Sequence, residues 1–118
     1  MLYSYMAISS SMLKGSLQTI LLKLLHENGK MYGYEITQKV KVITNGEIKL
    51  TEGAIYPSLH KLVAEGLLIT HTEMHENRVR KYYALTAAGE TELADKMKEA
   101  ESFIGHLQLL LQLKPDLS

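Results

Sequence analysis

The residues best suited to bind a polyanion are gathered in one short stretch of the chain. Asn77 is followed by Arg78 and Arg80, the only two arginines among the 118 residues, and then by Lys81. A guanidinium group offers a planar fork of donors that fits phosphate oxygens, and arginine side chains also enter narrow minor grooves of DNA. Because the surrounding residues alternate as in a strand that follows a turn, the stretch predicts the basic tip of a β-hairpin.

A second candidate surface lies on a predicted helix that begins at Thr51. The Thr51 hydroxyl can accept a hydrogen bond from an otherwise unpaired amide of the first turn, which makes it a good N-cap. Helical spacing of apolar residues predicts a buried stripe of Ile55, Leu59, Leu62 and Val63. The opposite face carries small, aromatic and basic side chains that suit contact with DNA, namely Gly53, Tyr56, His60 and Lys61. Pro57 lies about six residues into the helix and predicts an irregular first turn.

The remaining elements must hold these two surfaces together. The apolar spacing predicts helices over residues 12–28 and 32–44 before the helix that begins at Thr51, with Ile36, Val40 and Ile43 on one side of the second helix. Strands over 67–73 and 78–85 and a last helix over 86–113 follow. This order predicts a mainly α fold with a small β-hairpin, which is a winged helix-turn-helix with a C-terminal helix. We expect a flexible arm at 1–11, the DNA-binding domain at 12–85, a dimerisation helix at 86–113 and a tail at 114–118.

The last helix predicts self-association. Its apolar residues step by four and three, as in a short coiled-coil seam, at Leu93, Met97, Ala100, Ile104, Leu107 and Leu111. Further leucines lie outside the seam, so the helix has more apolar surface than one chain can bury. We therefore expect a homodimer in which this helix, including Phe103, packs against the first helix of the partner at Leu13, Leu17 and Leu21.

Composition excludes several classes of protein. The net charge is zero, but residues 1–85 carry ten Lys/Arg and seven Asp/Glu, whereas residues 86–118 carry three and six. A mildly basic front joined to an acidic helix is compatible with nucleic-acid binding by the front alone. There is no cysteine, no apolar run long enough for a membrane span and no secretory leader. His71 and His75 would lie about 13 Å apart along a strand, too far to share a metal. We expect no enzyme, no metal and no cofactor.

Four motifs together resemble the PadR family of bacterial transcriptional regulators. They are KGSLQTILLKLL, YGYEI, EGAIYPSLHKLVAEGLL and RKYYALTAAGE, and the resemblance covers about residues 13–108. The single last helix is similar to that of the smaller subfamily. The resemblance implies a cytoplasmic homodimer that binds double-stranded DNA at palindromic sites and represses transcription.

The resemblance also implies roles for individual residues. DNA contacts are expected from Thr51, Gly53, Tyr56 and Lys61 in the recognition helix, from Asn77, Arg78 and Arg80 in the wing, and from Tyr32 and Tyr34 near the DNA backbone. Some relatives respond to a small apolar or phenolic effector near the dimer interface. This chain has no tryptophan there, so the effector, if there is one, stays unidentified.

A second reading of the same residues is a winged-helix module whose basic wing meets an acidic protein. The two readings differ in salt dependence, because contact with about six to ten phosphates loses orders of magnitude of affinity between 50 and 200 mM salt. No arrangement of residues in the sequence favours an enzyme.

Overall fold

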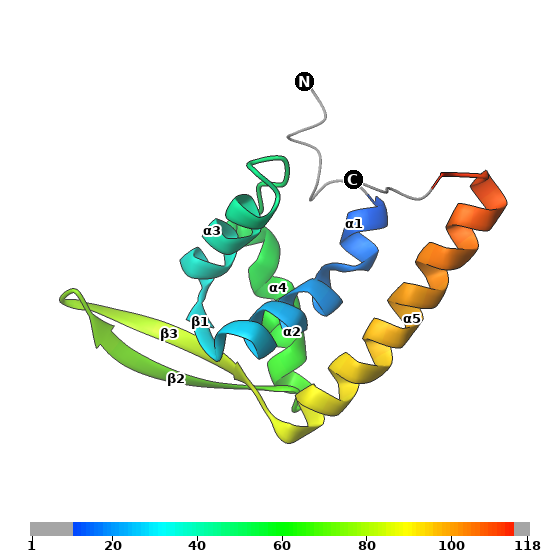
Figure 1. Ribbon diagram of the computed structural model, residues 1–118. Helices are drawn as coiled ribbons and strands as arrows, with labels where there is room; N and C mark the ends of the chain where they lie inside the picture. The colour runs from blue at the N-terminus through cyan, green and yellow to red at the C-terminus, as the bar shows by residue number, and fades with distance from the viewer. Residues whose placement is uncertain (1–10, 115–118) are drawn as a thin grey trace.

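The computed structural model describes residues 11–114 as a mainly helical fold with a three-stranded antiparallel sheet (Figure 1). The elements in chain order are α1 (Ser11–Gly15), α2 (Leu17–Asn28), β1 (Lys30–Tyr32), α3 (Gly33–Ile43), α4 (Glu52–Ala64), β2 (Leu68–His75), β3 (Arg78–Leu85) and α5 (Ala87–Leu111). The predicted winged helix-turn-helix with a C-terminal helix is confirmed. The arm and the tail expected at the two ends lie, apart from Ser11 and Lys114, outside the described residues.

The first helix differs from its prediction, because the single helix expected over 12–28 is two. α1 ends at Gly15, and Ser16 adopts φ −103° and ψ 0° before α2 begins. The Ser16 N–H donates to the Leu13 carbonyl at 2.9 Å, and the Ser16 carbonyl then accepts from Ile20 at 3.0 Å. Glycine and serine are weak helix formers, and serine is favoured at an N-cap. The chain therefore restarts its helix at a point where apolar spacing alone shows no break.

The sheet contains one strand that was not predicted. β1 pairs with β3, with Met31 opposite Tyr83 and Tyr32 opposite Tyr82, and the strand order is β1-β3-β2. Three residues are too few to show an alternating pattern, which is why β1 was not predicted. β2 runs to His75, two residues beyond its expected end. Because β1 leads directly into α3, the hairpin is joined to the start of that helix.

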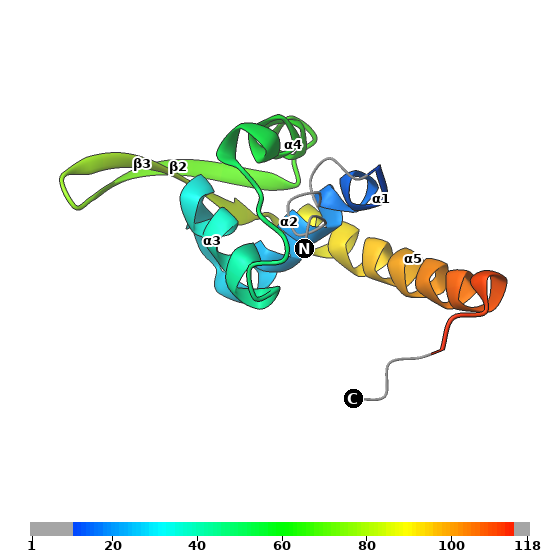
Figure 2. The same ribbon diagram turned by 90° about the horizontal axis from the view of Figure 1, so that it is seen from above.

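The wing, defined here as β2, the turn and β3, is closed by two residues in left-handed conformation. Glu76 and Asn77 have φ values of 54° and 64°. Two positive φ angles in a two-residue hairpin loop are the mark of a type I′ turn, whose twist matches that of the strands. The wing protrudes from the helices, as Figures 1 and 2 show.

The core lies between α2, α3, α4 and the inner side of the sheet. Its fully buried side chains are Leu21, Leu22, Leu25, Ile36, Ile55, Leu59, Leu62 and Tyr83. The buried stripe predicted for α4 is confirmed at Ile55, Leu59 and Leu62, with Val63 partly buried. Of the three residues predicted on one side of α3, Ile36 and Val40 are buried, whereas 63% of Ile43 is exposed. Ile43 is the last residue of α3, one turn beyond the buried Val40, where the helix has passed the edge of the core.

α4 begins as predicted but is more regular than expected. The Thr51 Oγ1 accepts a hydrogen bond from the Ala54 amide at 3.1 Å, which confirms the N-cap. The helix then runs from Glu52 to Ala64 with Pro57 inside it, so the expected irregular turn is absent. The carbonyl that loses its donor belongs to Gly53, which is exposed. Water can hydrate that carbonyl, and the cost of a proline is smaller there than in a buried turn.

The first turn of α5 is fastened to the end of α4. The Thr86 Oγ1 accepts from the Gly89 amide at 3.0 Å and donates to the Gly66 carbonyl at 2.7 Å. Gly89 is buried, and a Cβ atom there would lie 2.2 Å from the Leu67 carbonyl oxygen. From this anchor the first half of α5 contacts α2 and adds Leu93 to the core, and its C-terminal half extends away from the other helices (Figure 1). Within residues 11–114, no helix has the length and apolar character needed to cross a membrane.

Candidate nucleic-acid interface

The exposed face of α4 presents the side chains that the sequence predicted for it. Gly53, His60 and Lys61 are exposed, and a Cβ at Gly53 would meet nothing within 4 Å. The His60 ring stacks on the Tyr56 ring, with centroids 6.0 Å apart and planes at 27°. Thr51, at the N-cap, is also exposed. The face is therefore open enough for close approach of a DNA groove.

Tyr56 is held more firmly than a free contact residue. Its hydroxyl donates to Glu52 Oε1 at 3.0 Å, and burial, followed by that hydrogen bond, raises the pKa of Tyr56 above its usual value. Its hydroxyl also lies 2.8 Å from where a Cβ at Gly33 would be. Gly33 opens α3, so the absence of a side chain there lets α3 pack under the Tyr56 ring. Tyr56 thus joins the two helices of the helix-turn-helix.

The cations of the wing are without acidic partners. Arg78 and Lys81 are exposed, Arg80 is half-buried, and none of the three takes part in any ion pair within the described part of the chain. Lys81 lies with its Nζ 5.7 Å from the centroid of the Tyr83 ring. Asn77 occupies the turn beside Arg78. Cations left unpaired on a protruding hairpin are available to an anion from outside the chain.

One face of the sheet carries a network of aromatic and charged side chains. We call it the outer sheet face, and it consists of Lys30, Tyr32, His71, Glu73, Arg80 and Tyr82. The Arg80 guanidinium carbon lies 4.6 Å from the centroid of the Tyr32 ring, and the Tyr32 and Tyr82 rings meet edge to face at 5.3 Å. Lys30 forms an ion pair with Glu73, and His71 Nε2 lies 2.6 Å from the same carboxylate. The hydrogen bond from Lys30, and then that from His71, lowers the pKa of Glu73 below its usual value.

This network changes the interpretation of Tyr32, the last residue of β1, and Tyr34, in the first turn of α3. Tyr32 is half-buried and already packed against wing residues, whereas 51% of Tyr34 is exposed. Lys30, His71 and Glu73 were not predicted as site residues. The register of the hairpin places Glu73 opposite Arg80, so Glu73 could have been predicted as a neighbour of the wing arginines from the sequence. The position of Lys30 depends on β1, a strand that has no recognisable pattern in the sequence.

The predicted dimer residues divide into three groups, which are buried, partly buried and exposed. Leu17, Leu21 and Leu93 are buried in their own chain, being at most 5% exposed. A side chain without free surface has nothing left to bury against a partner, so these three belong to the core. Leu13, Met97, Ala100 and Leu107 are partly buried.

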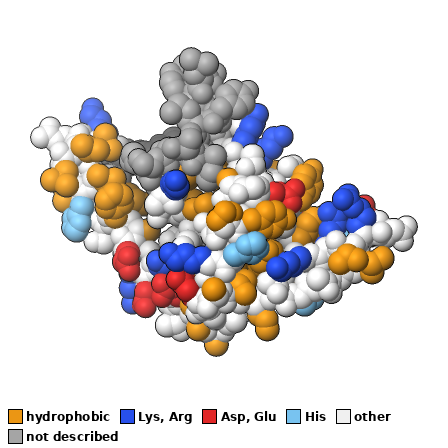
Figure 3. Space-filling view, turned by 180° about the vertical axis from the view of Figure 1, so that it is seen from behind, with side chains coloured by type: hydrophobic (Ala, Val, Ile, Leu, Met, Phe, Trp, Pro, Cys, Tyr) orange, Lys and Arg blue, Asp and Glu red, His pale blue; other side chains and the backbone are white. Residues whose placement is uncertain are grey.

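The exposed group lies on the C-terminal half of α5 and just beyond its end. Phe103, Ile104 and Leu111 are 60%, 55% and 58% exposed. They are joined by three leucines outside the predicted set, Leu109, Leu110 and Leu113, at 76%, 78% and 54%. Figure 3 shows hydrophobic side chains gathered at this end of the molecule, on the side opposite the wing.

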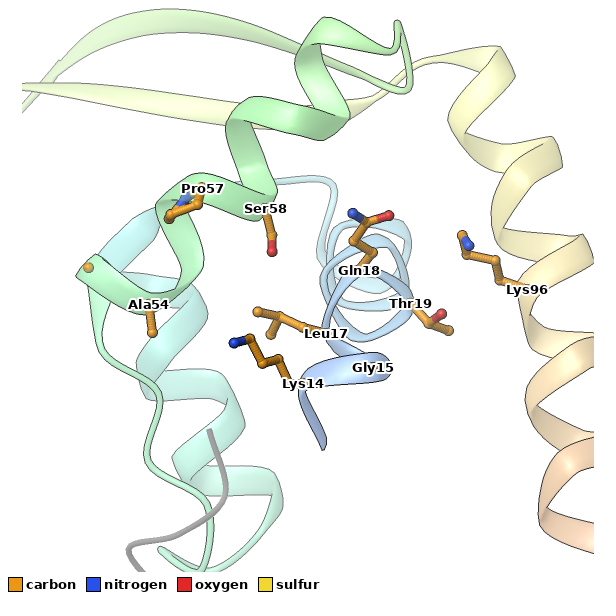
Figure 4. Close-up of a pocket in the computed structure, with 10 residues that line it drawn as sticks. Lys14, Gly15, Leu17, Gln18, Thr19, Ala54, Pro57, Ser58 and Lys96 are labelled. Atoms are coloured by element: carbon orange, nitrogen blue, oxygen red, sulfur yellow. The ribbon is translucent and has the colours of Figure 1, made fainter. Parts of the chain in front are cut away.

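An open groove of about 790 Å³ lies between the start of α4, the start of α2 and α5. Figure 4 shows Gln18 and Ser58 directed into it, with Lys14 on one side and Lys96 on the other. Lys96 also pairs with Glu92 at 3.6 Å. The lining mixes these polar side chains with apolar ones such as Leu17, Ala54 and Pro57.

Comparison with known proteins agrees with the geometry. Residues 21–95 match the Transcriptional regulator PadR-like family. The Mycobacterium tuberculosis transcriptional regulator Rv3488 is 29% identical over 82 residues, which cover 68% of this chain and 74% of that protein. The structure of a transcriptional regulator from Clostridium thermocellum is similar at a TM-score of 0.76 and 29% identity, covering 84% of this chain and 94% of that one. Bacillus subtilis PadR, solved in complex with operator DNA, is similar at a TM-score of 0.62 and 33% identity, covering 69% and 46%.

Proposed function

The chain belongs to the PadR-like family of transcriptional regulators, and we propose that it binds double-stranded DNA sequence-specifically, as a homodimer that represses transcription from a pseudo-palindromic operator. In this proposal residues 12–85 bind DNA and residues 86–113 form the dimer. The protein acts on DNA, so a cytoplasmic location is part of the same proposal.

The observation that carries DNA binding is the state of the wing cations. Arg78, Arg80 and Lys81 are unpaired within residues 11–114, while Lys30, Lys23 and Lys96 each have a carboxylate partner. Cations that neutralise phosphates release condensed counterions, and this release drives association. The similar Bacillus subtilis protein was solved with operator DNA, which supports the same partner here.

The proposal of a dimer is supported by the exposed end of α5. Six large apolar side chains more than half exposed form a surface that a monomer would leave in water. A two-fold axis through such an interface would present two copies of α4 to DNA. The half-sites should then lie about 10 base pairs apart, centre to centre, or a multiple of that.

The proposal is tested by selecting bound duplexes from a random pool, followed by affinity measurement on the selected site. We expect a sequence with two inverted half-sites, and an affinity that falls steeply between about 50 and 200 mM salt. Replacing Arg78 and Arg80 together with Ala should lower the slope of log affinity against log salt by about two. Lys39, half-buried on α3, provides a control: Lys39→Ala should leave the slope nearly unchanged if the wing is the main cationic contact.

Two results would count against the proposal. If the selected motif has no second half-site at any helical spacing, the protein does not bind its operator as a dimer with two recognition helices. Failure to bind any duplex at low salt, together with salt-sensitive binding to an acidic protein, would favour the interaction module instead.

A further inference from the structure

The outer sheet face holds an ion pair that differs from the one its strand register favours. Glu73 on β2 lies directly opposite Arg80 on β3. Residues opposite each other on one face of an antiparallel pair have close Cβ atoms, and opposite charges there attract. Yet the Glu73 carboxylate is bound by Lys30 and lies 2.6 Å from His71 Nε2. Within residues 11–114, Arg80 has no acidic partner.

Arg80 is held by an aromatic ring instead. Its guanidinium carbon lies 4.6 Å from the Tyr32 ring centroid, and its Nε is buried with no hydrogen-bond partner in the structure. Attraction between the cation and the ring offsets part of the cost of burying that end of the group. The terminal nitrogens of the guanidinium keep their donors for another acceptor.

The ring that holds Arg80 is itself fixed. The Tyr32 N–H donates to Glu35 Oε1 at 3.1 Å at the start of α3. The ring packs against Tyr82 at 5.3 Å and against His75 at 6.0 Å, so both strands of the wing contact it. Arg80 therefore lies near the tip of the wing in a defined position, with little freedom to lose when it binds.

We propose that Lys30 is a positioning residue for DNA binding: by holding the Glu73 carboxylate it keeps Arg80 unpaired on Tyr32 and available to a phosphate group. This inference rests on the proposed binding of DNA. Without Lys30, the nearest cation across the strand from Glu73 is Arg80, and their pairing would block the guanidinium. Lys30 then affects affinity without contacting DNA.

The test compares four variants by fluorescence anisotropy on one duplex over a range of salt concentrations. Arg80→Ala should weaken binding and lower the salt slope by about one, as expected for one phosphate contact. Lys30→Met should weaken binding with a similar change in slope, because the Glu73 carboxylate then forms an ion pair with Arg80. Lys30→Met combined with Glu73→Gln should restore the affinity and the slope of the unmodified protein. Lys30→Met combined with Arg80→Ala should be no weaker than Arg80→Ala alone.

A matched control separates this effect from general charge. Glu76, at the wing tip, is 77% exposed in its side chain and pairs with His75 at 3.2 Å. Lys30→Met combined with Glu76→Gln has the same net charge as Lys30→Met combined with Glu73→Gln. In the Glu76→Gln combination, however, Glu73 is still present and can pair with Arg80. We therefore expect that Lys30→Met combined with Glu76→Gln does not recover the slope of log affinity against log salt. The Lys30 side chain is 48% exposed, so its replacement should preserve the fold, which thermal unfolding would verify.

Two results would overturn the inference. If binding stays weak in the Lys30→Met and Glu73→Gln combination, Lys30 is itself a phosphate ligand. If Glu76→Gln restores binding equally well, the effect is one of net charge. The proposed function fails in a different way, because then the unmodified protein itself would bind no duplex.

Discussion

Replacing Gly89 with Ala should destabilise the protein, although it adds a better helix former to a helix. In an ordinary helix interior the change from Gly to Ala stabilises by about 1 kcal/mol. At Gly89 the new Cβ would lie 2.2 Å from the Leu67 carbonyl oxygen and 2.9 Å from Leu85 Cδ2. The first neighbour is backbone and cannot rotate away. The start of α5 must therefore move off the end of α4.

The size of the effect follows from three contributions. Forcing an atom into a packed site costs about 1–3 kcal/mol. The Leu67 carbonyl accepts from the Thr86 amide at 3.1 Å, and loss of that hydrogen bond adds about 1 kcal/mol. Subtracting the gain in helix propensity leaves a net loss of about 1–3 kcal/mol. For a domain of this size, that lowers Tm by about 4–12 °C.

The matched control is in the same helix. A Cβ at Gly105 would meet nothing within 4 Å, so Gly105→Ala should raise the stability by about 0.5–1 kcal/mol. Circular dichroism during thermal or urea unfolding measures both, at one fixed protein concentration because a dimer's Tm depends on it. If Gly89→Ala were as stable as Gly105→Ala, α5 would not be fastened to α4 by this contact.

Three further predictions concern the DNA-binding surface and the dimer. Gly33→Ala should weaken DNA binding because it displaces the Tyr56 hydroxyl, and Tyr56→Phe in the same chain should recover part of the loss; no recovery would exclude this contact. Ile104→Asp with Leu107→Asp should give a monomer or aggregate by light scattering, and an equally stable dimer would contradict the proposed interface. Lys61→Ala should cost about 1–3 kcal/mol per half-site on the selected operator and less on random DNA, whereas equal losses would make Lys61 a phosphate contact.

The parts of the fold that were predictable have signals within a few residues of one another. Thr51 and Thr86 cap α4 and α5 because each hydroxyl reaches an amide three residues ahead. The hairpin was found because its strands are adjacent in sequence and its turn is polar. Ser16, in contrast, interrupts a stretch whose apolar periodicity is continuous, and the restart is visible only from the backbone.

The candidate site was predictable in its charges but not in their pairing. Arg78, Arg80 and Lys81 stand together in the sequence, so their role as a basic tip needs only the hairpin. Whether Arg80 is free depends on Lys30, which is 43 residues from Glu73 and reaches it only because β1 joins the sheet. A three-residue strand with no periodicity of its own thus determines which cation the acidic residue holds. Register alone would have paired Glu73 with Arg80 and removed the guanidinium from the binding surface. The proposed availability of Arg80 therefore depends on β1, the strand that could not be predicted from the sequence.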